Sequence, residues 1–163
     1  ESKVVLEVSD DSSAPERDAE KQSLQVGRVK AVSLFSGCGG LDFGAIAAGA
    51  EIVFAVDSMA AAAKTLESHL QTADVQNKRI QQVKNFPTAD LLIGGYPCQS
   101  FSMGGKRKPQ DDSRSDLYLE YARAIQLINP KFFVAENVIG LRSVHAGSYL
   151  QKQLETFENC GKH

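Results

Sequence analysis

Short apolar runs alternate with amphipathic stretches along most of the chain. Four runs have the length and the β-branched or aliphatic content of buried strands: Val29–Phe35, Glu51–Val56, Ala89–Ile93 and Lys131–Ala135. Four stretches have the spacing or punctuation of helices: Leu41–Ala48, Met59–Leu70, Asp116–Ile128 and Gly147–Glu158. A weaker run, Arg79–Val83, is interpreted as the third strand of five. Because strands and helices alternate, the pattern predicts an α/β fold with a doubly wound, mostly parallel sheet in the order 3-2-1-4-5.

Residues 1–29 differ in composition from the rest of the chain. They hold seven acidic and four basic residues, whereas residues 30–163 hold thirteen acidic and fourteen basic ones. Val4–Val8 has the content of a short strand, but the polar stretch after it, with Pro15, is typical of a flexible lead-in. We therefore expect a lead-in over 1–29 and one domain over 30–163. The near-neutral domain does not by its composition indicate a nucleic acid partner.

The cysteine spacing and the hydropathy of the chain indicate the kind of cellular compartment in which the protein works. Cys38, Cys98 and Cys160 lie far apart and form no CxxC pair, which fits a reducing compartment better than a disulfide framework. No apolar run approaches the roughly 18 residues of a membrane helix, and no signal peptide opens the chain. Metal-ligand spacing is absent as well. We expect a cytoplasmic protein that needs neither a membrane nor a metal.

A glycine-rich turn follows the first predicted strand. The strand runs directly into Ser36–Gly40 and then into a helix, which is the arrangement that begins the ligand site of a doubly wound fold. Free N–H groups at such a helix start suit a polar or anionic ligand. Asp57 ends the second strand, where an acidic residue commonly binds ribose hydroxyls. The same carboxylate could instead cap the helix Met59–Leu70, and both roles are compatible.

A thiol and a carboxyl group end two further strands. Cys98 follows a buried strand and the pair Gly94-Gly95, and Glu136 follows the fifth strand. An isolated cysteine is more often a packing residue, but the carboxyl ends of parallel strands are where such sheets carry their chemistry. The predicted strand order brings Cys98, Glu136, Asp57 and the glycine turn to one edge. The loop 96–115 is polar, and its basic residues are either solvated or part of a functional lid.

Four motifs resemble those of one enzyme family. Residues 35–40, Pro97-Cys98-Gln99 and Glu136-Asn137-Val138 are similar to the first, fourth and sixth motifs of the DNA (cytosine-5) methyltransferases, and Asp112–Leu117 is similar to the fifth. They occur in the family's order and cover about residues 30–160. The resemblance implies the fold of an S-adenosylmethionine-dependent methyltransferase, with the C-terminal part of the domain missing.

The resemblance also implies a reaction on duplex DNA. In that family a methyl group passes from S-adenosylmethionine to C5 of a flipped-out cytosine. Cys98 would add to C6 of the base, and Glu136 would bind its edge and supply a proton at N3. The DNA-contacting residues would be Gln99, Ser102, Lys106, Arg107 and Arg114.

The implied cofactor residues surround the glycine turn and the ends of the strands. They are Phe35, Ser36, Gly37, Cys38, Gly39, Gly40, Asp57, Ser58, Ile80, Gly95, Pro97 and Leu117. Two positions depart from the family. Ser58 stands where a large aromatic residue often packs on adenine, and Arg79 stands where an acid often reads the adenine amino group.

The motifs that complete such an enzyme do not follow. The Gln-x-Arg-x-Arg motif and the target-recognition segment are absent from the 163 residues. A fragment of a longer chain, one subunit of a split enzyme, and a partial chain remain as explanations. An alternative function is a methyltransferase-like partner without turnover of its own. A dinucleotide-dependent oxidoreductase is disfavoured because it leaves Cys98 and Glu136 unexplained.

Overall fold

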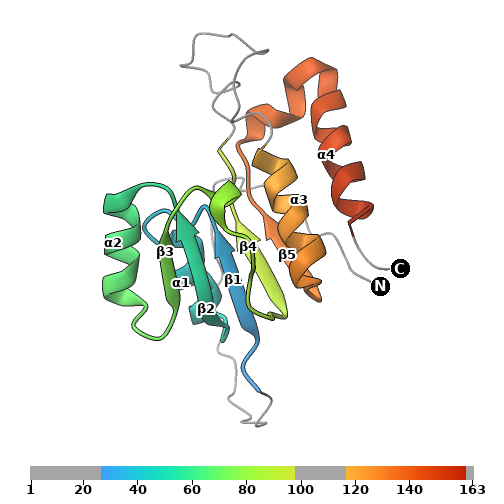
Figure 1. Ribbon diagram of the computed structural model, residues 1–163. Coiled ribbons are helices and arrows are strands. Elements are labelled where there is room, and N and C mark those ends of the chain that lie inside the picture. Colours follow the sequence, from blue (N-terminus) through green and yellow to red (C-terminus); the bar gives the residue numbers. More distant parts are fainter. Residues whose placement is uncertain (1–26, 98–116, 161–163) are drawn as a thin grey trace, which may run out of the picture.

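The computed structural model describes residues 27–97 and 117–160 (Figure 1). Its strands are β1 (Lys30–Leu34), β2 (Glu51–Asp57), β3 (Asp74–Asn77), β4 (Leu91–Gly94) and β5 (Phe132–Ala135). Its helices are α1 (Gly40–Ala47), α2 (Ala60–His69), α3 (Leu117–Ile128) and α4 (Ser148–Glu158), with 3₁₀ segments η1 (Ile80–Gln82) and η3 (Ile139–Gly147). All five strands are parallel, in the order β3-β2-β1-β4-β5. The predicted fold class and strand order are confirmed.

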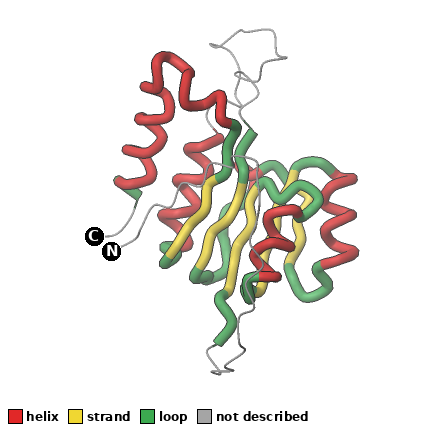
Figure 2. Tube along the Cα trace, turned by 180° about the vertical axis from the view of Figure 1, so that it is seen from behind, coloured by secondary structure: helices red, strands yellow, loops and turns green. Residues whose placement is uncertain are grey.

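Helices cover both faces of the sheet. Val32, Leu34 and Leu92 are buried on the face covered by α3 and α4, whereas Ala31 and Ile93 are buried on the face covered by α1 and α2. Figure 2, seen from behind, shows α1 in front of the sheet. Strands buried on both faces read as continuous apolar runs, which is why β1 and β4 are easy to recognise in the sequence.

The third strand was predicted at the wrong place. The structure has it at β3, which pairs with the end of β2 from Phe54↔Asp74 to Asp57↔Asn77. The run Arg79–Val83 instead contains the 3₁₀ turn η1, and its two apolar residues, Ile80 and Val83, are buried three positions apart. β3 was missed because it is an edge strand of polar residues, and an edge strand needs no continuous apolar run.

The ends of β1 and β4 lie unusually close together. Gly94 pairs with Leu34, and a Cβ atom on Gly94 would collide with the Leu34 carbonyl oxygen. Glycine is therefore required there for the segments after these two strands to leave the sheet side by side. The lead-in over residues 1–26, including Val4–Val8, lies outside the described residues. No helix in 27–97 or 117–160 is long and apolar enough to cross a membrane.

Candidate functional site

The carboxylate of Asp57 connects the glycine turn to the end of β2. One oxygen, Oδ2, accepts a hydrogen bond of 2.9 Å from the Gly37 N–H, and the other, Oδ1, accepts one of 2.7 Å from the Met59 N–H. The second bond lies directly before α2, but the N-cap of that helix is Met59 and no side chain bonds to its first N–H groups, so Asp57 does not cap it as the capping interpretation expected. Each carboxylate oxygen keeps a free lone pair, so a ligand hydroxyl can bind as well.

Phe35 adopts a strained backbone at the end of β1. Its φ angle is +53°, in the left-handed region that bulky residues rarely occupy. Its ring packs edge-on against Tyr96, with 6.5 Å between ring centroids. Strain of this kind persists where the surrounding structure holds it, commonly at a ligand site. The motif at residues 35–40 includes Phe35, but nothing in the sequence predicts that its backbone is strained.

A cavity of about 370 Å³ lies beside Asp57. Its lining combines one acidic and two basic side chains with apolar ones: Phe35, Val56, Asp57, Ser58, Lys78, Arg79, Ile80, Gln81, Pro97 and Leu117. A cavity of this size and mixed lining is typical of a small-molecule or cofactor site. The residues come from five separate segments of the chain, which only the folded sheet brings together.

Six of the expected cofactor residues meet in this cavity, namely Phe35, Asp57, Ser58, Ile80, Pro97 and Leu117. The remaining ones lie elsewhere. Ser36 is buried, and its hydroxyl bonds to Ser33 and to the Val56 carbonyl, so it fixes the turn to the sheet. Gly39, at φ +95°, packs beneath Leu66. Cys38 and Gly40 are exposed outside the lining.

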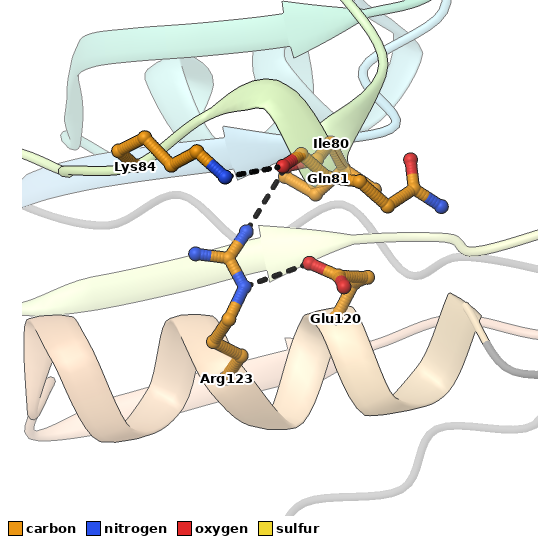
Figure 3. Close-up of polar contacts among 5 residues, drawn as sticks. All are labelled: Ile80, Gln81, Lys84, Glu120 and Arg123. Atoms are coloured by element: carbon orange, nitrogen blue, oxygen red, sulfur yellow. Dashed lines mark hydrogen bonds and ion pairs between the residues drawn. The ribbon is translucent and has the colours of Figure 1, made fainter.

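Arg123 joins two walls of the cavity (Figure 3). Its Nη2 donates a 3.0 Å hydrogen bond to the carbonyl of Ile80 in η1, and its Nε donates a 2.7 Å bond to Glu120. The guanidinium also lies 5.6 Å from the ring centroid of Phe86, within cation–π range. Because Arg123 belongs to α3, whose first residue is Leu117, it ties η1 to the helix on the other side of the cavity. No motif in the sequence marks this residue.

Glu136 lies against Gly95. The backbone N–H of Glu136 donates to the Gly94 carbonyl at 3.0 Å, which continues the β4–β5 pairing beyond both strands. A Cβ atom on residue 95 would stand 2.5 Å from the Glu136 Oε2. Gly95 was expected at the cofactor, but it is absent from the cavity lining and instead makes room for the carboxylate of Glu136.

Asn137 fixes the segment that leaves β4. Its Nδ2 donates a 2.9 Å bond to the Tyr96 carbonyl, and its Oδ1 accepts one of 2.9 Å from the Val138 N–H. Pro97 follows Tyr96 and lines the cavity, so the segment Gly95–Pro97 has Glu136 on one side and the cavity on the other. Cys98 is bonded to Pro97 but lies outside the described residues, as do Gln99, Ser102, Lys106, Arg107 and Arg114.

Other titratable groups lie away from this edge. Cys160 is buried, and burial raises the pKa of its thiol, so it stays protonated and unreactive at neutral pH. Asp42 in α1 is fully buried without a hydrogen-bond partner for its carboxylate, and burial raises its pKa. Across the described part of the chain, no three histidine, cysteine or acidic residues cluster as metal ligands.

Comparison with known proteins gives this arrangement a context. Residues 29–163 match the family model of the C-5 cytosine-specific DNA methylases. The chain is 40% identical over 137 residues to the Type II methyltransferase M.NgoFVII of Neisseria gonorrhoeae, covering 82% of this chain and 37% of that relative. It is 38% identical over 135 residues to M.FnuDI of Fusobacterium nucleatum, covering 82% and 39%.

Solved structures of methyltransferases are similar to this chain as well. The crystal structure of a candidate DNA modification methyltransferase from an E. coli prophage superposes with a TM-score of 0.67 at 30% identity, covering 80% of this chain and 38% of that one. The S. pombe Dnmt2 methyltransferase, at 24% identity and a TM-score of 0.58, shares the fold. The chain thus spans about two fifths of the length of the relatives it matches. With the family model matching nearly the whole chain, the protein belongs to the C-5 cytosine-specific DNA methylase family.

Proposed function

We propose that the polypeptide containing this chain is a DNA (cytosine-5) methyltransferase. It transfers a methyl group from S-adenosylmethionine to C5 of a cytosine flipped out of duplex DNA. The observation that carries the proposal is the packing of the Glu136 carboxylate against Gly95, beside a cavity of about 370 Å³. Gly95 precedes Cys98 by three residues, so a carboxyl group, a cofactor-sized cavity and the chain leading to a thiol share one edge of the sheet.

Cys98 and Glu136 have different roles in the reaction of the base. The thiolate of Cys98 adds to C6, forming an S–C6 bond and moving an electron pair toward C5. Glu136 hydrogen-bonds the base edge and supplies a proton at N3, which makes C6 more electrophilic. After C5 has taken the methyl group, a base accepts the C5 proton. The electron pair of that C–H bond re-forms the C5–C6 double bond, the S–C6 bond breaks to release the thiolate, and the N3 proton returns to Glu136.

The cavity residues hold the cofactor. Phe35 offers an aromatic face for adenine, and Asp57 offers carboxylate oxygens for the ribose hydroxyls, while keeping its bonds to Gly37 and Met59. S-adenosylmethionine, when bound, supplies an electrophilic methyl group. The backbone of residues 37–40 is proposed for its methionine end. The side chain of Arg79 cannot accept a hydrogen bond. The adenine amino group must therefore donate to another group of the protein or to solvent.

DNA contacts fall to residues beyond β4 and to the remainder of a full-length enzyme. Gln99, Ser102, Lys106, Arg107 and Arg114 are proposed to reach the flipped nucleotide and its phosphates, where basic side chains give salt-sensitive affinity. Sequence-specific contacts are proposed to come from polypeptide beyond these residues, in the same chain or in a second one. The setting we propose is the cytoplasm of a bacterium, at the nucleoid.

Covalent trapping tests the proposal. Duplex DNA with 5-fluorocytosine at the target position holds the adduct, because fluorine at C5 cannot leave as a proton does. We expect the full-length polypeptide with S-adenosylmethionine to form a complex that survives denaturing electrophoresis, and Cys98→Ser to form none. The matched control is Cys160→Ser, a buried thiol away from this edge whose hydrogen bond to the Thr156 carbonyl a serine can keep, and it should trap normally.

The trapping result separates the two functions considered for this chain. A partner module without turnover would form no adduct with either the wild type or Cys160→Ser. Equal trapping by Cys98→Ser would remove Cys98 from its proposed role.

A further inference from the structure

A glutamine is buried in α4 where an aliphatic residue would be expected. The side chain of Gln153 is 1% exposed, and its Nε2 has no hydrogen-bond partner. Its Oε1 accepts a hydrogen bond of 2.5 Å from the hydroxyl of Tyr96, which is also buried. Leaving an amide N–H unpaired inside a protein opposes folding. The contribution of Gln153 to stability is therefore limited to the one hydrogen bond that it accepts from Tyr96.

The partner of Gln153 belongs to the segment that joins the cavity to Glu136. Tyr96 stands between Gly95, which faces the Glu136 carboxylate, and Pro97, which lines the cavity and is bonded to Cys98. The position of Tyr96 therefore decides how the chain passes from the end of β4 toward the proposed nucleophile.

Tyr96 is held at both ends. Its carbonyl accepts the 2.9 Å hydrogen bond from Asn137, and its hydroxyl donates to Gln153, 57 residues further along the chain. Its ring has aromatic neighbours on several sides, including Phe35 at 6.5 Å and Phe157 at 6.2 Å between centroids. The packing fixes the ring within the core, and the hydroxyl bond fixes its rotation and depth.

A small cavity borders the same contact. It has a volume of about 120 Å³, and Tyr96, Gln153 and Phe157 are among its mostly apolar lining residues. Without the hydrogen bond, the tyrosine ring has this adjacent space into which it can shift. The hydrogen bond to Gln153 thus holds the Tyr96 hydroxyl beside this cavity.

We propose that Gln153 is a positioning residue for the active site, acting through the Tyr96 hydroxyl on the segment Gly95–Pro97. The inference rests on the proposed methyltransferase function, because it concerns the chain that leads to Cys98. Gln153 touches no reacting atom. Its contribution is to hold that segment in the geometry in which a thiol and the Glu136 carboxyl group can act on one base.

Two variants remove the hydrogen bond between Tyr96 and Gln153, each by changing one of its two partners. Tyr96→Phe deletes only the hydroxyl and keeps the ring, and Gln153→Leu deletes the amide and keeps most of the volume. In full-length enzyme we expect either variant to lower kcat roughly tenfold, since small displacements at a reacting centre have effects of this order or larger. The KM for S-adenosylmethionine should change less than about twofold, because neither change removes a cofactor-lining side chain.

The double variant distinguishes positioning from core stability. Gln153→Leu alone removes the Oε1 acceptor of the Tyr96 hydroxyl and so lowers the melting temperature, whereas Tyr96→Phe/Gln153→Leu removes both members of that bond. We expect the double variant to melt at or above the wild-type temperature and still to show the roughly tenfold loss in kcat of a single variant. Gln151→Leu, on the exposed face of α4, is the matched control and should keep wild-type kcat.

A second readout does not depend on turnover. The alkylation rate of the Cys98 thiol by iodoacetamide, followed by mass spectrometry of the peptide that contains Cys98, should change at least about threefold in Tyr96→Phe and Gln153→Leu but not in Gln151→Leu. Wild-type kcat and alkylation rates in both variants would overturn the inference, as would activity that simply follows melting temperature. If the wild type fails to methylate DNA, the proposed function fails, and the alkylation rates still decide the positioning role.

Discussion

The two sides of the candidate site are built differently. On the cofactor side, Asp57 binds the backbone N–H groups of Gly37 and Met59, twenty and two residues away. On the catalytic side, Tyr96 is held by the side chains of Asn137 and Gln153, 41 and 57 residues away. Backbone donors survive substitution of the residues that carry them, whereas side-chain donors such as Asn137 and side-chain acceptors such as Gln153 do not. We therefore expect the catalytic side to be the more sensitive to mutation.

The largest effect is expected from Gly95→Ala. The added methyl group would lie 2.5 Å from the Glu136 Oε2, so the carboxylate or the segment must move. We expect the single-turnover methyl transfer rate to fall about 100-fold, with cofactor affinity little changed. Gly44→Ala, where an added Cβ meets nothing within 4 Å, is the control and should keep its rate. A near-normal rate in Gly95→Ala would mean that the catalytic side tolerates displacement of Glu136.

Asp57→Ala should have the next largest effect, and on the cofactor side. Removing the carboxylate leaves the Gly37 N–H and the ribose hydroxyls without this acceptor, which should weaken S-adenosylmethionine binding by about 1–3 kcal/mol. Isothermal titration calorimetry measures this directly. Unchanged affinity would assign Asp57 to the turn and the start of α2 alone.

Arg123→Met tests whether cofactor affinity also depends on a side chain outside the cavity lining. Methionine keeps the apolar stem but removes the bonds to Ile80 and Glu120. We expect cofactor affinity to fall roughly three- to tenfold, in line with about 1 kcal/mol for one hydrogen bond. The control is Lys84→Met, which loses only a 3.4 Å bond to the Gln81 carbonyl within the same wall. An equal loss in both variants would deny Arg123 its connecting role.

The smallest effect concerns Asp42, away from both sides. Burial raises its pKa above the ordinary 3.8, so the neutral carboxyl favours folding; this contribution is fully present below pH 3.8 and is lost as the pH rises through the raised pKa. Asp42→Asn should therefore gain stability relative to the wild type as the pH rises from 4 toward 7. Urea denaturation across that range measures the difference. A difference that stays constant with pH would contradict the assignment.

The contrast between local contacts around Asp57 and distant side-chain contacts around Tyr96 explains which features the sequence could predict. β1, the glycine turn and Asp57 follow one another within thirty residues and carry recognisable local patterns, so their places in the fold were predicted, and their role in cofactor binding stays a prediction. Gln153 and Arg123 were missed because their roles arise from contacts across the fold, and neither interrupts the helical pattern around it. β3 was missed because polar edge strands carry little hydrophobic signal. Gly95 was predicted as a site residue, but only the structure gives its contact with Glu136.

The central claim is tested most directly by methyl transfer itself. Full-length polypeptide is incubated with duplex DNA and tritiated S-adenosylmethionine, and the modified nucleoside is identified by chromatography and mass spectrometry. The account predicts tritium in 5-methylcytosine, and no transfer above background with Cys98→Ser. Label on another base or atom, or undiminished transfer by Cys98→Ser, would contradict it.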